Sequence, residues 1–238
     1  MITPKDIERK TMSESKRREA KKSIWGFYVG RPITYVMTVP FLYTNISPNT
    51  ITWISIVCIT VAYYVMSIAT TTTMRLVGLL LIFMWSMGDG IDGNIARYKG
   101  IKSSKGDLLD TLGGYLAIVI VILGMGNMAY HDSNALVLNS NEIVMELAGI
   151  SAVASLIPRV LMHRQLALKR EITDANKLKD KENYGLLKLV ALNICDPAGF
   201  QEHIVLVAIL FHLETEFTIF YLILNIAIMI YSIKEMIK

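Results

Sequence analysis

Residues 89–97 read DGIDGNIAR and follow directly on a long apolar run. On a helix, residues three and four apart lie on the same side, so positions 89, 92, 93, 96 and 97 share one face. That face carries two carboxylates, two small residues and an arginine. The apolar run and this face together predict a buried helix with a polar site near its end.

A second polar stretch follows after a short loop. Residues 106–114 read GDLLDTLGG, and Gly106, Asp110 and Gly114 lie on one helical face. The short connection makes the two helices antiparallel neighbours, so a carboxylate cluster is expected at one end of the pair. Carboxylates at membrane depth are costly unless they are paired or bind a cation, which makes them candidates for function. Their hard oxygens suit Mg²⁺, Mn²⁺ or Ca²⁺. A structural cation site or an ion-pair network around Arg97 is the alternative.

The composition indicates that lipid covers much of the chain. Hydrophobic residues make up 53% of the 238 residues and charged residues only 18%, whereas soluble domains carry about 25% charged residues. The net charge of +4 is interpreted as an orientation signal, and no nucleic-acid partner is expected.

The fold class predicted is an all-α integral membrane bundle of six transmembrane helices with an N-terminal amphipathic interfacial helix. Each predicted span is close to the roughly 20 residues that a helix needs to cross a bilayer. The part from Ser15 to Tyr28, where a basic stretch leads into aromatic residues, is the expected interfacial helix. Residues 1–30 are therefore set apart as an N-terminal segment from a six-helix domain at 31–238. The expected spans are 49–69, 74–97, 106–128, 142–168, 186–213 (irregular) and 217–237.

The charges of the loops predict the orientation. The N-terminal segment, the loops near 99–105 and 169–181 and the C-terminal end are rich in Lys and Arg, whereas the alternate loops have none. By the positive-inside rule, both termini and the carboxylate site face the cytoplasm.

The spacing of these residues resembles the signature of the CDP-alcohol phosphotransferase (CDP-alcohol phosphatidyltransferase) family. That signature is Asp-x-x-Asp-Gly-x-x-Ala-Arg, eight residues, then Gly-x-x-x-Asp-x-x-x-Asp. All fixed positions match except the last, where Gly114 stands. Residues 31–32 and 47–52 also resemble the family's entry into its first span. With the six-span layout, the resemblance covers most of the chain.

The resemblance implies transfer of a substituted phosphate from a CDP-linked alcohol to an acceptor hydroxyl, with release of CMP, in phospholipid or related envelope synthesis. It implies a divalent metal, Mg²⁺ or Mn²⁺, and a homodimer in the lipid bilayer. The implied metal ligands are Asp89, Asp92 and Asp110. The implied nucleotide-binding residues are Asp89, Asp92, Gly93, Ala96, Arg97, Gly106, Asn49 and Thr52.

Gly114 departs from the family at the position assigned to the general base. Asp107, one turn before Asp110, and Asp196, beside Pro197, are candidate replacements. Two alternatives stay open. The acceptor needs no protein base if it is anionic or metal-activated, or the chain binds metal and nucleotide without standard turnover.

The acceptor pocket is harder to locate than the metal site. Arg159 and Arg31 are the candidates for holding an anionic acceptor, although the positive-inside rule also places such residues at helix ends. A transporter would explain charges at membrane depth, but it predicts polar residues along several spans, and here they gather at one end.

Overall fold

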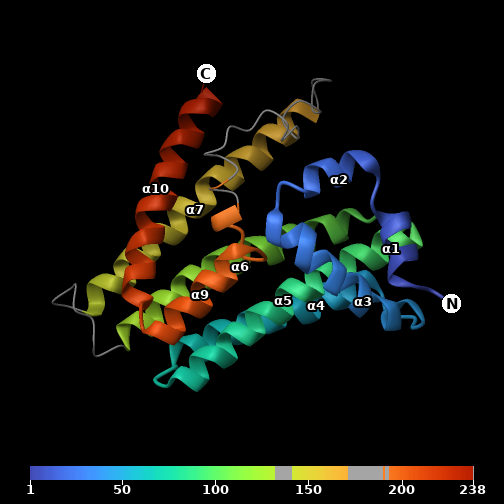
Figure 1. The fold of residues 1–238 in the computed structure, drawn as a ribbon. Coiled ribbons are helices and arrows are strands. Elements are labelled where there is room, and N and C mark those ends of the chain that lie inside the picture. The colour runs from blue at the N-terminus through green and yellow to red at the C-terminus, as the bar shows by residue number, and fades with distance from the viewer. Residues whose placement is uncertain (132–140, 171–189, 191–192, 238) are drawn as a thin grey trace.

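The computed structural model describes residues 1–131, 141–170, 190 and 193–237, and the described part contains helices and no strand (Figure 1). The all-α prediction is confirmed. Five helices in this part are long and apolar enough to cross a membrane. They are α4 (Pro48–Ser67), α5 (Thr72–Lys99), α6 (Ser104–Tyr130), α7 (Asn141–Arg170) and α10 (Glu214–Ile237).

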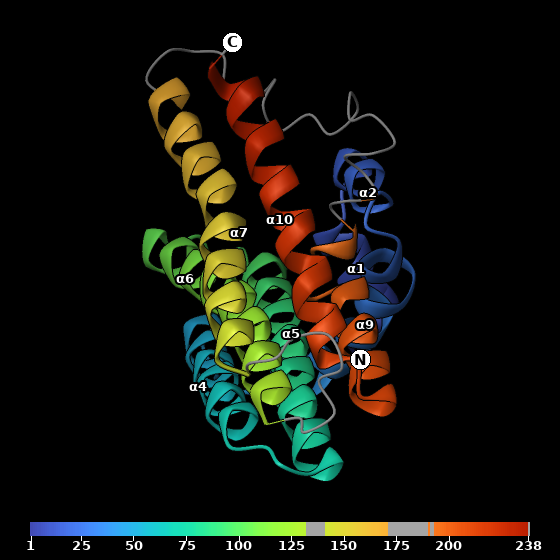
Figure 2. The same ribbon diagram turned by 90° about the vertical axis from the view of Figure 1, so that its left-hand side faces the viewer.

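Helices α4, α5 and α6 pack together, and α7 and α10 pair beside α6 (Figure 2). The shared core is apolar and runs from Ile59 and Met66 of α4 through Ile82 of α5 and Met125 of α6 to Tyr221 of α10. Where α4 meets α5 the backbones lie close, because a Cβ at Gly88 would come within 2.0 Å of the Ser55 hydroxyl. This close packing holds the polar end of α5 against its neighbours.

The fifth expected span, 186–213, is not one continuous helix. Its described part contains α9 (Phe200–Phe211), which packs on α5 and is preceded by turns at Cys195–Gly199. Pro197 lacks a backbone N–H, which opposes helix continuation at this point. Twelve residues of helix rise about 18 Å, short of the roughly 30 Å hydrocarbon core. Residues 186–189, 191 and 192 lie outside the described residues, as does most of the expected basic loop 169–181, so the count of six stays a prediction.

The N-terminal region forms more helix than the sequence predicted. Helices α1 (Pro4–Thr11) and α2 (Glu14–Ala20) are followed by one π-helical turn, η1 (Gly26–Gly30), which continues into α3 (Arg31–Leu42). The single interfacial helix expected over 15–28 is therefore wrong in its bounds, and α3 was not expected. α1 packs on α3 and α5 (Figure 1). The proposed division of the chain at residue 30 stays a prediction.

The connection from α5 to α6 positions the carboxylate site. Gly100 ends α5 in the left-handed region with φ of 69°, and the Ile101 N–H bonds back to the Ala96 carbonyl. A residue with a Cβ is disfavoured in that conformation, so glycine suits the stop. Ser103 then caps α6 by accepting a bond from the Gly106 N–H. The four residues from Gly100 to Ser103 thus turn the chain back and set Asp110 beside α5.

A buried ion pair ties the opposite end of the bundle. Arg75 near the start of α5 bonds Glu214 at the start of α10, and both side chains are almost inaccessible. Arg75 also contacts His212 and the Met128 carbonyl, so it links α5, α6 and the α9–α10 turn.

We expect Glu214→Ala to destabilise the protein by about 3–5 kcal/mol, because it leaves the Arg75 charge buried without its carboxylate. Glu216→Ala is the matched control, since Glu216 lies on the same turn and is exposed. Thermal unfolding in detergent micelles compares the two. Equal melting temperatures for both variants would contradict the role given to this pair.

Candidate active site

A cavity of about 970 Å³ opens at the end of α5 that is remote from Arg75. It is lined by the N-terminal segment, α3, α4, α5, the start of α6 and the turn before α9. Its acidic lining residues are Glu19, Asp89, Asp92, Asp107, Asp110 and Asp196, and its basic ones are Lys16, Arg31, Arg97 and Lys102. The sequence motif therefore lies in one hollow shared by six parts of the chain.

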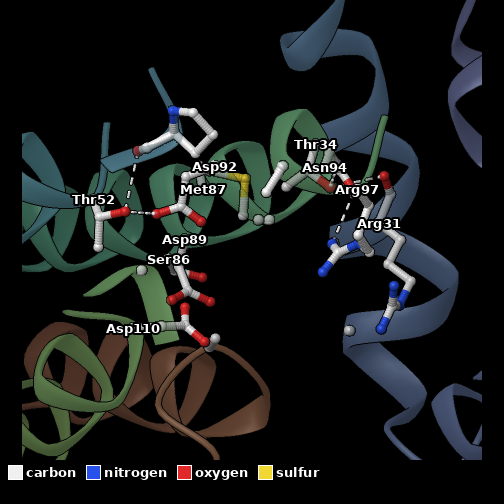
Figure 3. Close-up of a pocket in the computed structure, with 18 of the residues that line it drawn as sticks. Arg31, Thr34, Thr52, Ser86, Met87, Asp89, Asp92, Asn94, Arg97 and Asp110 are labelled. Carbon is white, nitrogen blue, oxygen red and sulfur yellow. Dashed lines mark hydrogen bonds between the residues drawn. The ribbon is translucent and has the colours of Figure 1, made fainter. Parts of the chain in front are cut away.

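The acidic side of the cavity brings three motif aspartates together. The carboxyl groups of Asp89 and Asp110 point toward one another across the α5–α6 interface, within hydrogen-bonding reach (Figure 3). Asp92 is 4% exposed and accepts a hydrogen bond of 2.5 Å from the Thr52 hydroxyl of α4. Thr52 thereby fixes the direction of the third carboxylate.

The carboxylates around Asp89 and Asp110 are the candidates for holding a divalent cation. Among the described residues, no three His, Cys, Asp or Glu side chains are already grouped closely enough to hold a metal ion, and Asp92 is hydrogen-bonded to Thr52. Asp89 and Asp110 nevertheless form no ion pair in this part of the chain. Two facing carboxylates without a cation repel each other, and a hard divalent ion between their oxygens would relieve that repulsion. The donor set fits such an ion.

Arg97 is positioned by a chain of hydrogen bonds from α3. Its guanidinium donates to the side-chain amide oxygen (Oδ1) of Asn94 at 3.2 Å, and the side-chain amide nitrogen of Asn94 donates to the Thr38 hydroxyl at 3.2 Å. Asn94 is only 2% exposed. A Cβ at Gly93 would lie 2.9 Å from the Arg97 guanidinium. The glycine therefore lets Arg97 fold back along α5 at the cavity wall.

The small residues predicted for nucleotide binding lie on this wall. Gly93, Ala96 and Gly106 line the cavity together with Asn49 at the start of α4. A Cβ at Gly106 would approach the Asn49 side-chain oxygen to 3.2 Å. The structure thus places all eight predicted nucleotide-site residues around one cavity: Asn49, Thr52, Asp89, Asp92, Gly93, Ala96, Arg97 and Gly106.

The two candidate replacements for the general base line the cavity, whereas the base position itself, Gly114, does not. Gly114 is outside the cavity lining, and a Cβ there would meet no atom within 4 Å. Asp107 and Asp196 both line the cavity. Asp107 is exposed in the first turn of α6. Asp196 is partly buried in the turn before α9, where its carboxylate accepts a bond from the Ala198 N–H, and its charge acts on Asp89.

Of the two arginines proposed to bind the acceptor, Arg31 lines the cavity and Arg159 does not. Arg31 lines the cavity and lies beside Arg97, across the cavity from the carboxylates (Figure 3). Arg159 of α7 is not among the lining residues. Its guanidinium donates to the Cys195 carbonyl at 3.2 Å, so it supports the turn that carries Asp196.

Sequence reasoning missed several residues of the site. Thr34 of α3, Asn94 of α5 and Lys16 of α2 take part in it, and Glu202 of α9 lies beside the cavity residue Ser86. Asn94 occupies a variable motif position, and the others lie far from the motif in the chain. Of these residues, only Asn94 could have been identified from the sequence. Its amide lies within a largely apolar helix, and a buried amide needs hydrogen-bond partners.

Comparison with known proteins identifies one matching family. A family model described as CDP-alcohol phosphatidyltransferase matches residues 45–231, which is most of the chain. No curated protein matches the sequence significantly.

Proposed function

The chain belongs to the CDP-alcohol phosphatidyltransferase family, and from this we propose that it is a metal-dependent enzyme that transfers a substituted phosphate from a CDP-linked alcohol to an acceptor hydroxyl and releases CMP. Members of this family act on a CDP-alcohol and an acceptor in a membrane setting. The observation that carries the proposal is the facing pair Asp89 and Asp110 in a cavity walled by Gly93, Ala96 and Arg97.

In this proposal Asp89, Asp92 and Asp110 hold Mg²⁺ or Mn²⁺. The ion, when bound, neutralises charge on the donor's diphosphate and stabilises the leaving CMP. Thr52 orients Asp92 through their hydrogen bond. Gly93, Ala96 and Gly106 present backbone without bulky side chains, which leaves room for the flat cytosine ring beside α5, with Asn49 at the edge and Arg97 next to the nucleotide.

The proposed reaction also needs a general base, because glycine stands at position 114, where the family signature has an aspartate. Asp196 is the better of the two candidates, because it is partly buried, its carboxylate is held by the Ala198 N–H and its charge acts on Asp89, whereas Asp107 is exposed in the first turn of α6. We assign Asp196 as the group that accepts the proton of the acceptor hydroxyl. The hydroxyl oxygen then attacks phosphorus, the bond from phosphorus to the CMP oxygen breaks, and CMP leaves with its electron pair.

The wider setting follows from the sequence and the family. We propose that both termini and the cavity face the cytoplasm, on the loop charges, and that the protein acts in phospholipid or envelope synthesis as a homodimer in the bilayer. Arg31 is proposed to bind the acceptor, and Arg159 to position Asp196 through the Cys195 carbonyl.

One specific observation favours a second candidate function. Gly114 leaves open space where the family base would stand, so a protein that binds metal and CDP-nucleotide without turnover is the alternative. CMP release by the purified protein, with Mg²⁺ or Mn²⁺ and a panel of CDP-alcohols and acceptors, separates the two. CMP release supports the transferase, and metal-dependent CDP binding without release supports the alternative.

We expect Asn94→Ala to raise the KM for the CDP-alcohol by about tenfold while kcat changes less than about twofold. The reason is that Arg97 loses its acceptor, and a bond to a charged group contributes about 1.5–3 kcal/mol. Steady-state kinetics measure both constants. Asn127→Ala, at the far end of α6, is the control for removing an amide. An equal loss of kcat in both variants would mean that Asn94 is only structural.

A further inference from the structure

The N-terminal segment forms one wall of the cavity, although it precedes residue 45, where the match to the family model begins. Ser23, Gly26 and Gly30 are among the lining residues that it supplies. The segment is anchored beside the bundle, because α1 and α3 pack on α5. It also has a small apolar core of its own, made by Ile7, Met12, Ala20 and Tyr35. The family assignment gives this wall no role, so any role depends on its contacts across the cavity.

One side-chain amide joins this wall to the turn before α9. The Asn193 amide nitrogen donates to the Lys22 carbonyl at 2.8 Å, and the Ile24 N–H donates to the Asn193 amide oxygen at 2.9 Å. Both ends of the amide therefore bond the backbone just after α2. A second contact between the same two parts of the chain comes from Trp25 and His203, whose rings meet edge to face with centroids 3.9 Å apart.

The bundle holds the two residues that lead from this amide to Asp196. The Tyr221 hydroxyl of α10 donates to the Ile194 carbonyl at 2.7 Å, and the Arg159 guanidinium of α7 donates to the Cys195 carbonyl at 3.2 Å. Carbonyls at the end of a helix lack the partners that a continuing helix would supply. These two side chains supply them, and they fix the turn from the side of α7 and α10.

We propose that Asn193 is a positioning residue for Asp196, through which the N-terminal segment holds the proposed base in the cavity. The turn is then restrained from both sides, by α7 and α10 on one and by residues 22–24 on the other. A reacting group displaced by about 1 Å can lose about 10²-fold in rate. The segment and the turn are each anchored elsewhere, so loss of the Asn193 amide loosens the base without unfolding either part. This role rests on the proposed function.

The first test measures the contact without any substrate. Hydrogen–deuterium exchange of the full chain in detergent is followed by mass spectrometry on peptides that overlap at Ile24, whose N–H bonds Asn193. An amide that is released by local opening exchanges faster. We expect exchange at Ile24 to be about tenfold faster in Asn193→Ala and unchanged in Asn127→Ala, which removes an amide at the far end of α6. Equal exchange in Asn193→Ala and the unaltered chain would overturn the proposal.

The second test measures catalysis. Asn193→Ala should lower kcat for CMP release by about tenfold and leave the KM for the CDP-alcohol within about twofold, because it displaces the base and not the donor. In an Asp196→Asn background it should cost nothing further, since residues that act through one group are not additive. Trp25→Leu loosens the same contact from the other side, and its loss of kcat should depend on Asp196 in the same way.

The outcomes separate this role from the proposed function. CMP release with an unchanged kcat in Asn193→Ala, or with an equal loss when Asp196 is already replaced, would overturn the positioning role and leave the transferase standing. No CMP release by the unaltered chain from any substrate pair would refute both. Melting temperatures show whether Asn193→Ala folds normally. If it does not, Asn193→Asp takes its place in both tests, because it keeps the oxygen that accepts from Ile24 and loses the donor to Lys22.

Discussion

Asp89→Asn and Asp110→Asn should each lower kcat/KM for CMP release by about 10³-fold or more. Each variant removes one carboxylate of the facing pair, and metal and electrostatic stabilisation of a developing charge contributes several kcal/mol to catalysis. Steady-state CMP release measures the loss. Affinity for Mn²⁺, measured by calorimetry on the same samples, should fall as well, because a neutral amide is a poorer ligand than a carboxylate.

Asp107→Asn is the matched control for this experiment. Asp107 lines the same cavity, has the same side chain and, like Asp110, is exposed, but Asp110 is the residue of α6 that faces Asp89. We expect the activity of Asp107→Asn to stay within about threefold of the unaltered chain, since this variant leaves both carboxylates of the facing pair in place. Equal losses in all three variants would show only that negative charge in the cavity matters.

Asp196→Asn should lower kcat by about 10²-fold to 10⁴-fold, the usual contribution of a positioned general base. The KM for the CDP-alcohol should change little, because the proposed base acts on the acceptor hydroxyl in the chemical step and is not proposed to hold the donor. Single-turnover measurements report the chemical step directly.

The structure also offers a rescue of this loss. A Cβ at position 114 would meet no atom within 4 Å, so Gly114→Asp is tolerated sterically and puts a carboxylate at the position where the resemblance to the family signature implies a base. The double variant Asp196→Asn, Gly114→Asp should recover at least about tenfold of the lost kcat. If Asp196→Asn keeps full activity, the base assignment is wrong. If it is inactive and the double variant stays inactive although folded, Asp196 has a different role.

The sequence predicted the fold class and the centre of the site because both depend on local patterns. Long apolar runs predicted α4, α5, α6, α7 and α10, and helical spacing predicted that Asp89 and Asp110 meet. The eight-residue gap between Arg97 and Gly106 carries a helix stop and a helix cap, at Gly100 and Ser103. Such features are readable without knowledge of the rest of the chain.

The parts that failed depend on contacts between distant segments. α3 has only 12 residues and contains Pro40, and it packs against α1 and α5. In the sequence, nothing distinguishes Lys16 from the other basic residues of the N-terminal segment. In the structure, the apolar core formed by Ile7, Met12, Ala20 and Tyr35 places α2 over the cavity, and Lys16 lines it. The depth of Arg159 in the apolar run also gave no sign that it lies outside the cavity lining, with its guanidinium donating to the Cys195 carbonyl, so its role as an acceptor ligand stays a prediction. No sequence period encodes these tertiary contacts.

The measurement that tests the central claim most directly is a joint count of CMP and transfer product. The purified chain is incubated with Mg²⁺ or Mn²⁺, a CDP-alcohol and a hydroxyl acceptor, and both products are quantified by mass spectrometry. The account predicts one CMP for each acceptor that gains the substituted phosphate, and neither product in EDTA or in Asp89→Asn. CDP-nucleotide that binds without forming either product, across the whole substrate panel, would contradict it.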